Sequence, residues 1–137
     1  MKRIVTIISM IFAFCMIGKA APVLLKGHND CSVTGLETAG GKLYMSITNG
    51  IYGGRSQVNV ICSSNSGKSF SAPVLTLSDE SLSVMGGVLW EDASGRLWLF
   101  YTETMGYYDG RGVLKAVRCD NPSDAAPTWT EPVQLGY

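Results

Sequence analysis

The sequence predicts an all-β fold made of β-propeller blades, about two of them with four strands each. Three short blocks occur twice in the same order: residues 41–44 return as 95–98, residues 60–62 as 117–119, and residues 69–74 as 128–133. The offsets are 95 − 41 = 54, 119 − 62 = 57 and 132 − 73 = 59 residues, so small insertions lengthen the second copy. Propeller blades repeat every roughly 40–50 residues and bury their apolar faces mainly against their neighbours.

Each copy contains four β-type runs separated by turn residues. The expected strands are 31–37, 42–48, 57–63 and 70–77 in the first copy, and 84–91, 96–101, 112–119 and 128–135 in the second. Blade one therefore spans about residues 28–77 and blade two about residues 82–137. The 16 glycines and 5 prolines suit a turn-rich β chain. After residue 21, apolar residues recur at period two or in short runs, which argues against helices.

The connections between these strands are of two kinds. Residues 38–41 and 92–95 are short and contain glycine, which allows the positive φ of a tight hairpin. Residues 49–56 and 103–111 are longer, are rich in Gly, Tyr and Arg, and each follows the second strand of a blade. Function is concentrated on loops that a rigid scaffold holds in place. We therefore expect a binding site at the two long loops.

Charge and histidine content restrict the partners and cofactors that we expect. Lys plus Arg and Asp plus Glu both number 11, so the formal net charge is zero. This balance gives no support for nucleic acid or an acidic membrane surface as a partner. His28 is the only histidine, and the cysteines lack the spacing of metal ligands. We expect neither a metal site nor a cofactor.

Residues 1–20 have the pattern of a secretory signal peptide. Lys2 and Arg3 form a basic start, and Ile4–Ile17 is an apolar or small run that is short for a membrane span. Gly18 and Ala20 supply the small residues before a cleavage site after Ala20. The expected location is secreted or periplasmic, with residues 21–137 as the mature chain and no membrane contact after cleavage. The alternative is a retained N-terminal anchor.

Three cysteines remain after removal of the signal peptide, namely Cys31, Cys62 and Cys119. An odd number in an exported chain requires at least one free or intermolecular thiol. In the aligned blocks Cys62 and Cys119 hold equivalent positions, so both a disulfide and two separate buried thiols stay open.

The sharpest motif is a turn at residues 63–70, which resembles the Asp-box. Such a turn needs an Asp or Asn side chain that accepts backbone N–H bonds, a glycine with positive φ, and an aromatic ring that packs into the blade. A degraded copy runs from residue 119 to residue 129 with an insertion and without the central glycine. The residues expected to form the structural box are Ser63, Asn65, Gly67, Ser69 and Phe70.

Together with residues 88–101, which lead from an apolar strand through an acidic turn into an aromatic-rich strand, this motif resembles the sialidase superfamily with BNR repeats (Asp-boxes). The resemblance covers roughly residues 28–137. It implies a six-bladed propeller and an exported glycoside hydrolase of the exo-α-sialidase type, acting on a glycan. In active members an Asp serves as acid/base, a Tyr with a Glu as nucleophile, and three arginines bind the substrate carboxylate.

The chain departs from this pattern where the first catalytic-site arginine is expected. Residues 28–31 read His-Asn-Asp-Cys there, and the Tyr–Glu pair and the other arginines belong to later blades. We therefore expect a truncated propeller that is inactive alone and self-associates through its open blade face. The alternative function is a non-catalytic module that binds a glycan or a protein.

Candidate site residues follow from their position in the predicted blades. Asp30 is the candidate catalytic acid, beside the start of the first strand. The candidates for substrate binding are His28, Asn29, Arg55, Glu103, Tyr107 and Arg111. Residues 28–30 also suit a plain linker, and the loop residues also suit a solvated loop tip.

Overall fold

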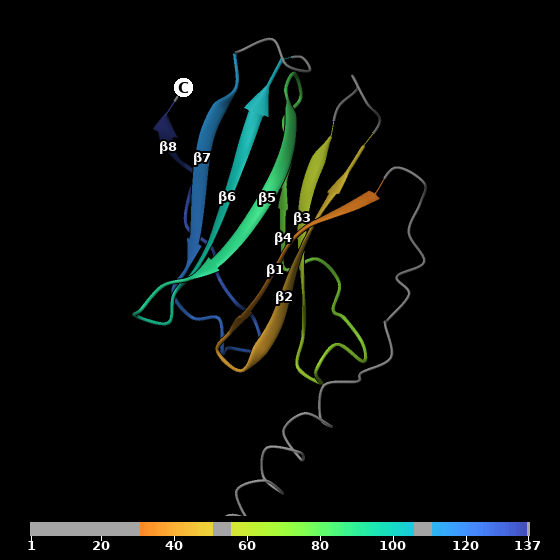
Figure 1. Cartoon of the computed structure of the whole chain (residues 1–137), viewed down its shortest axis with the longest axis vertical. Helices are drawn as coiled ribbons and strands as arrows, with labels where there is room; N and C mark the ends of the chain where they lie inside the picture. The colour runs from red at the N-terminus through yellow and green to blue at the C-terminus, as the bar shows by residue number, and fades with distance from the viewer. Residues whose placement is uncertain (1–30, 51–55, 106–110, 137) are drawn as a thin grey trace, which may run out of the picture.

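A computed structural model of the chain describes residues 31–50, 56–105 and 111–136, and these form two antiparallel sheets (Figure 1). The first sheet contains β1 (Cys31–Ala39), β2 (Lys42–Asn49), β3 (Gln57–Ser63) and β4 (Leu75–Leu77). The second contains β5 (Ser83–Glu91), β6 (Leu97–Thr104), β7 (Val113–Cys119) and β8 (Val133–Gly136). The described residues form strands, turns and irregular segments without a helix, which confirms the all-β prediction.

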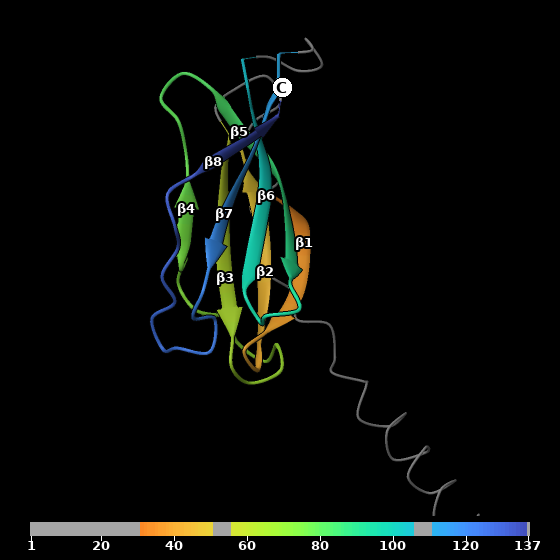
Figure 2. The same ribbon diagram turned by 90° about the vertical axis from the view of Figure 1, so that its left-hand side faces the viewer.

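Each sheet is a meander in which neighbouring strands follow one another along the chain. The two meanders lie face to face, with β5 against β1, β2 and β3, and Figure 2 views this stack from the side of the second sheet. The described residues include no helix with the length and apolar character needed to cross a membrane. The predicted signal peptide, residues 1–20, lies outside the described residues.

The fourth strand of each sheet is shorter than predicted. We expected strands from residues 70 and 128, whereas β4 begins at Leu75 and β8 at Val133. Before these strands the chain makes single backbone bonds, such as Ser71 N to Cys62 O at 2.8 Å, and not a regular ladder. Pro73 and Pro132 lie in these segments, and a proline has no N–H to donate to a ladder.

The side chains that β2 buries in the core are not its most apolar ones. Tyr44 and Ser46 face the second sheet and are fully buried. Leu43, Met45 and Ile47 face away from it and are only half-buried. The more polar set of the alternation therefore faces the core, and the apolar set lies on the outside.

The apolar core lies between the two sheets. It consists of Ala39, Tyr44, Val58, Val60, Val84, Leu89, Leu97, Leu99, Tyr101, Val117 and Cys119. Most of these residues alternate along β2, β3, β6 and β7, as expected for strands with one buried face. Removal of this apolar area from water is the main force that holds the sheets together.

The sheets touch through small residues at their centre. The Ser46 hydroxyl donates to the carbonyl oxygen of Gly87 at 2.6 Å. A Cβ atom on Gly35 would lie 2.6 Å from Ser46 Oγ and 2.9 Å from Gly87 O. A Cβ atom on Gly87 would lie 2.9 Å from Val58 Cγ1 and 3.2 Å from Leu99 Cδ1. Both glycines lie at β-bulges, where the ladders of β1 and β5 shift register, and both leave the backbones free to approach each other.

A second set of contacts joins the sheets near the β1–β2 hairpin. The buried Tyr44 hydroxyl donates to Pro122 O at 2.5 Å. Lys42 Nζ donates to the carbonyl oxygen of Asp124. A Cβ atom on Gly40 would collide with the backbone of Ser123. The insertion in the second repeat therefore closes one end of the core.

We expect Gly35→Ala to lower the free energy of unfolding by about 1–3 kcal/mol, because the added methyl group forces the two sheets apart. Gly136→Ala is the matched control, since a Cβ atom there meets nothing within 4 Å. Urea unfolding followed by circular dichroism measures the difference. Equal stability of the two variants would contradict the close approach at Gly35.

Candidate functional site

The connections separate into two ends of the stack. The β2–β3, β4–β5 and β6–β7 connections leave one end, here named the loop end. The β1–β2, β3–β4, β5–β6 and β7–β8 connections leave the other, here named the turn end (Figure 1). The two predicted long loops are therefore at the same end of the molecule. The loop end also receives the β4–β5 connection, which the sequence did not indicate.

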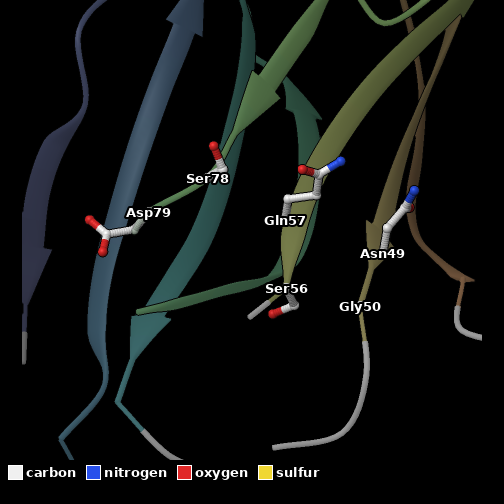
Figure 3. A pocket seen from close by; sticks show the side chains of 6 residues that line it. All are labelled: Asn49, Gly50, Ser56, Gln57, Ser78 and Asp79. Atoms are coloured by element: carbon white, nitrogen blue, oxygen red, sulfur yellow. The ribbon is translucent and has the colours of Figure 1, made fainter. Parts of the chain in front are cut away.

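A polar hollow of about 360 Å³ lies at the loop end (Figure 3). Its lining comes from the end of β2, the start of β3 and the segment after β4, and consists of Asn49, Gly50, Ser56, Gln57, Ser78 and Asp79. All of these residues except Gly50 have polar side chains. Amide and hydroxyl groups both donate and accept hydrogen bonds, which suits a ligand rich in hydroxyl groups.

The residues of the hollow differ in what else they bind. Ser56 is buried and its hydroxyl donates to Val84 O at 3.0 Å, so it joins the two sheets. Asp79 Oδ1 accepts bonds from the backbone N–H groups of Ser81 at 2.7 Å and Leu82 at 2.9 Å. Asn49 Oδ1 is buried and has no donor within hydrogen-bond distance among the described residues. The amide oxygen of Asn49 is thus enclosed by protein atoms and is not presented to a ligand in the hollow.

Glu103 is the predicted site residue whose surroundings are best defined. It lies near the end of β6, and its side chain is 12% exposed. Its Oε2 atom is 2.5 Å from Lys115 Nζ. Tyr101 lies two residues earlier on the same face and is buried. Burial raises the pKa of Tyr101 to about 12, with a smaller contribution from the negative charge of Glu103. Glu103 therefore serves as an ion-pair partner, and Tyr101 stays protonated at neutral pH.

The other predicted site residues are placed as follows. Arg111 is exposed and lies just before β7, at the same end as Glu103. His28, Asn29, Asp30, Arg55 and Tyr107 lie outside the described residues. The structure thus places Glu103 and Arg111 at the loop end and adds Lys115 and the polar hollow. Asn49 and Gln57 flank the first long loop, so loop length was the signal that pointed towards them.

Residues 63–70, whose sequence resembles an Asp-box, form a turn held by their own side chains. Ser63 Oγ accepts a bond from Gly67 N at 2.9 Å and donates to Asn65 Oδ1 at 2.8 Å. Asn65 Oδ1 accepts from Ser69 N at 3.0 Å, and Asn65 Nδ2 donates to Ser69 Oγ at 2.8 Å. Gly67 has φ +80°, the left-handed region that glycine favours. Phe70 is half-buried and lines a second hollow of about 590 Å³ at the turn end.

The degraded copy reproduces part of this turn. Asn121 Oδ1 accepts bonds from Thr128 N at 2.9 Å and Thr128 Oγ1 at 3.1 Å. Cys119 Sγ donates to Asn121 Oδ1 at 3.4 Å, in the place of the Ser63 hydroxyl. Trp129 packs against the core. An Asn side chain therefore organises both turns, although the second lacks the glycine.

The strand register corrects the predicted equivalence of Cys62 and Cys119. Leu43 pairs with Ser63, whereas Leu97 pairs with Cys119, so Cys119 corresponds to Ser63. Cys62 corresponds to Arg118, because the N–H groups of both bond a hydroxyl on the following segment. The block alignment failed because it matched identical residues and not backbone positions. Cys31, Cys62 and Cys119 are free thiols, and burial raises the pKa of Cys119.

Within residues 31–50, 56–105 and 111–136, no three His, Cys, Asp or Glu side chains group as metal ligands would. The chain matches no protein-family model, no curated protein and no solved structure.

We expect Asn65→Ala to lower the free energy of unfolding by about 1–2 kcal/mol, because it removes both bonds to Ser69. Asn65→Asp keeps the acceptor and loses only the Nδ2 donor, so its loss should be smaller. Ser64→Ala, an exposed neighbour in the same turn, is the control. Denaturant midpoints compare the variants, and equal midpoints for Asn65→Ala and Ser64→Ala would show that the turn does not depend on Asn65.

The raised pKa of Tyr101 predicts a loss of stability at high pH. The unfolded tyrosine ionises near pH 10, whereas the folded side chain ionises near pH 12. The contribution of Tyr101 to stability is thus complete below about pH 10 and is lost as pH rises towards 12. Urea unfolding at pH 9 and pH 11 should show a smaller decrease for Tyr101→Phe than for the wild type. Equal decreases would contradict the shift.

Proposed function

We propose that the two sheets are two blades of a sialidase-like β-propeller and that the chain is an exported unit that binds carbohydrate through its loop end. The observation that carries the proposal is the polar hollow of Asn49, Gln57, Ser78 and Asp79 at the ends of the first long loop. Side-chain amides, a hydroxyl and a carboxylate lie around it on three separate segments. Such a set bonds the hydroxyl groups of a sugar in several directions.

Two features support the assignment of propeller blades. Both sheets are four-stranded meanders with a bulge in the first strand. Both also have an Asn-centred turn between the third and fourth strands, at Asn65 and at Asn121. A blade-like repeat with these turns is what the resemblance to sialidases with Asp-boxes implies.

We further propose that the chain alone binds carbohydrate without cleaving it. A retaining sialidase needs a carboxylic acid and an activated tyrosine. At the loop end, Glu103 is held in an ion pair with Lys115, and Tyr101 has a raised pKa, which opposes formation of the phenolate. These contacts favour a binding role over exo-α-sialidase activity for the chain on its own.

The test is a titration of the purified chain with a sialylated trisaccharide and with its neutral core, followed by calorimetry. We expect binding that Gln57→Ala and Asn49→Ala each weaken about tenfold, which is the loss of one well-placed hydrogen bond. Ser64→Ala at the turn end is the control and should leave affinity unchanged. Free sialic acid should stay at the level of the buffer.

The outcomes separate the parts of the proposal. Absence of binding to either sugar, or equal affinities of the wild type and both loop-end variants, would overturn the assignment of the hollow. Release of sialic acid by the wild type would overturn the inactive role while leaving the binding site in place.

A further inference from the structure

Among the residues that the structure describes, each sheet has one face against the other sheet and one open face. The open face of the first sheet carries Leu36, Leu43, Met45 and Ile47, and Leu36 is 57% exposed. Ile61 lies on the same side but is only 8% exposed. The open face of the second sheet consists of Val88, Trp90, Trp98, Phe100 and Leu114, and Trp90 is 50% exposed. Apolar surface of this kind on both sides of a molecule marks interaction sites.

The open face of the first sheet is equivalent to the covered face of the second. The registers of β2 and β6 match at a shift of 97 − 43 = 54 residues. Leu43 and Met45 thereby correspond to Leu97 and Leu99, which are buried against the first sheet. Ile61 corresponds in the same way to Val117, which is also buried. This open face therefore has the apolar character of a face that already packs on a sheet.

The open face of the second sheet is equivalent to the covered face of the first. Trp98 and Phe100 correspond to Tyr44 and Ser46, and Leu114 corresponds to Val58. Tyr44, Ser46 and Val58 are fully buried under the second sheet. Within one chain, the second sheet covers the face of the first sheet that contains Tyr44 and Ser46. If the same packing is repeated, the first sheet of another copy covers Trp98 and Phe100.

The aromatic rings on this face are held in position before any partner arrives. Trp98 stacks on Phe100 at a centroid distance of 6.2 Å, and Trp90 lies 6.4 Å from Phe100. The Trp98 Nε1–H group donates to Asp92 Oδ2 at 2.9 Å. Arg118 lies over the Trp98 ring at 5.4 Å. A preorganised face loses less side-chain entropy on binding than a mobile one.

We propose that a second copy of this chain packs the open face of its first sheet on the open face of the second sheet, and that repetition closes a ring. The two faces differ, so the contact is head-to-tail, and such contacts form rings when the rotation closes. Each copy contributes the two sheets that its described residues form. A ring of about two to four copies then has about four to eight blades, the range found in propellers. Assembly through these faces depends on sheet packing alone and does not require carbohydrate.

The new contact differs from the one inside the chain in its central residues. Within the chain, Gly35 and Ser46 allow close approach of the backbones. On the open face of the second sheet, Val88 and Phe100 take these places. Larger side chains therefore occupy the centre of the contact between copies, where the contact inside the chain has closely spaced backbones. Trp90 adds a further exposed ring to this contact.

The test is the mass of the purified chain by native mass spectrometry and light scattering over a range of concentrations. We expect one defined assembly of two to four chains. Trp90→Glu places a charge on the open face of the second sheet, and Leu36→Glu places one on the open face of the first sheet. Each substitution should therefore reduce the mass to that of a single chain. Ala93→Glu adds the same charge in the exposed β5–β6 hairpin and should leave the assembly intact. Circular dichroism checks that all variants keep their strands.

A mixture of the two broken variants distinguishes a head-to-tail contact from a symmetric one. The Trp90→Glu chain keeps an intact open face on its first sheet, and the Leu36→Glu chain keeps an intact open face on its second sheet. Mixing the two should therefore give a one-to-one pair that does not grow. The proposal is overturned by a monomeric wild type, by open filaments, by association that survives both substitutions, or by a mixture that stays monomeric.

Discussion

The structure depends on the close approach of two backbones at the centre of the sheet stack. Ser46 donates to Gly87 O across the interface, and neither Gly35 nor Gly87 has room for a side chain. This contact explains why β2 turns Tyr44 and Ser46 inward although Leu43 and Met45 are more apolar. A buried serine is stable here because its hydroxyl has a partner. Small residues thus set the spacing of the sheets, and the larger core residues fill the space around them.

The two ends of the stack have different chemistry because their polar groups have different partners. At the turn end, Asn65 and Asn121 bond the backbone and side chains of their own turns. Asp92 does the same in the β5–β6 hairpin, where bonds from Trp98, Arg96 and Ser94 hold its pKa well below its usual range. At the loop end, Asn49 Oδ1 has no donor among the described residues. Buried polar atoms without a partner are not confined to the loop end, since Trp129 Nε1 in the β7–β8 segment also has none among the described residues.

The open faces connect the fold to the proposed assembly. A sheet with apolar residues on both faces needs two neighbours, and the stack supplies only one to each sheet in the part of the chain that the structure describes. Head-to-tail repetition satisfies both faces with one kind of contact. It also places the loop ends of successive copies on the same rim of a ring, so that polar hollows repeat around it.

The sequence alone determined the all-β class, the hairpins and the Asn65 turn, because these depend on residues close together in the chain. The Asn side chain, Gly67 and the two-residue alternation carry that information locally. Only the tertiary structure decided which face of β2 is buried, because that choice depends on Gly87, which is distant in sequence. Strand order likewise brings Ser78 and Asp79 to Asn49 and Gln57. The strand register also showed that Cys119 and Cys62 are not equivalent positions of the two repeats. Equivalent positions are defined by hydrogen-bonded pairing and not by residue identity.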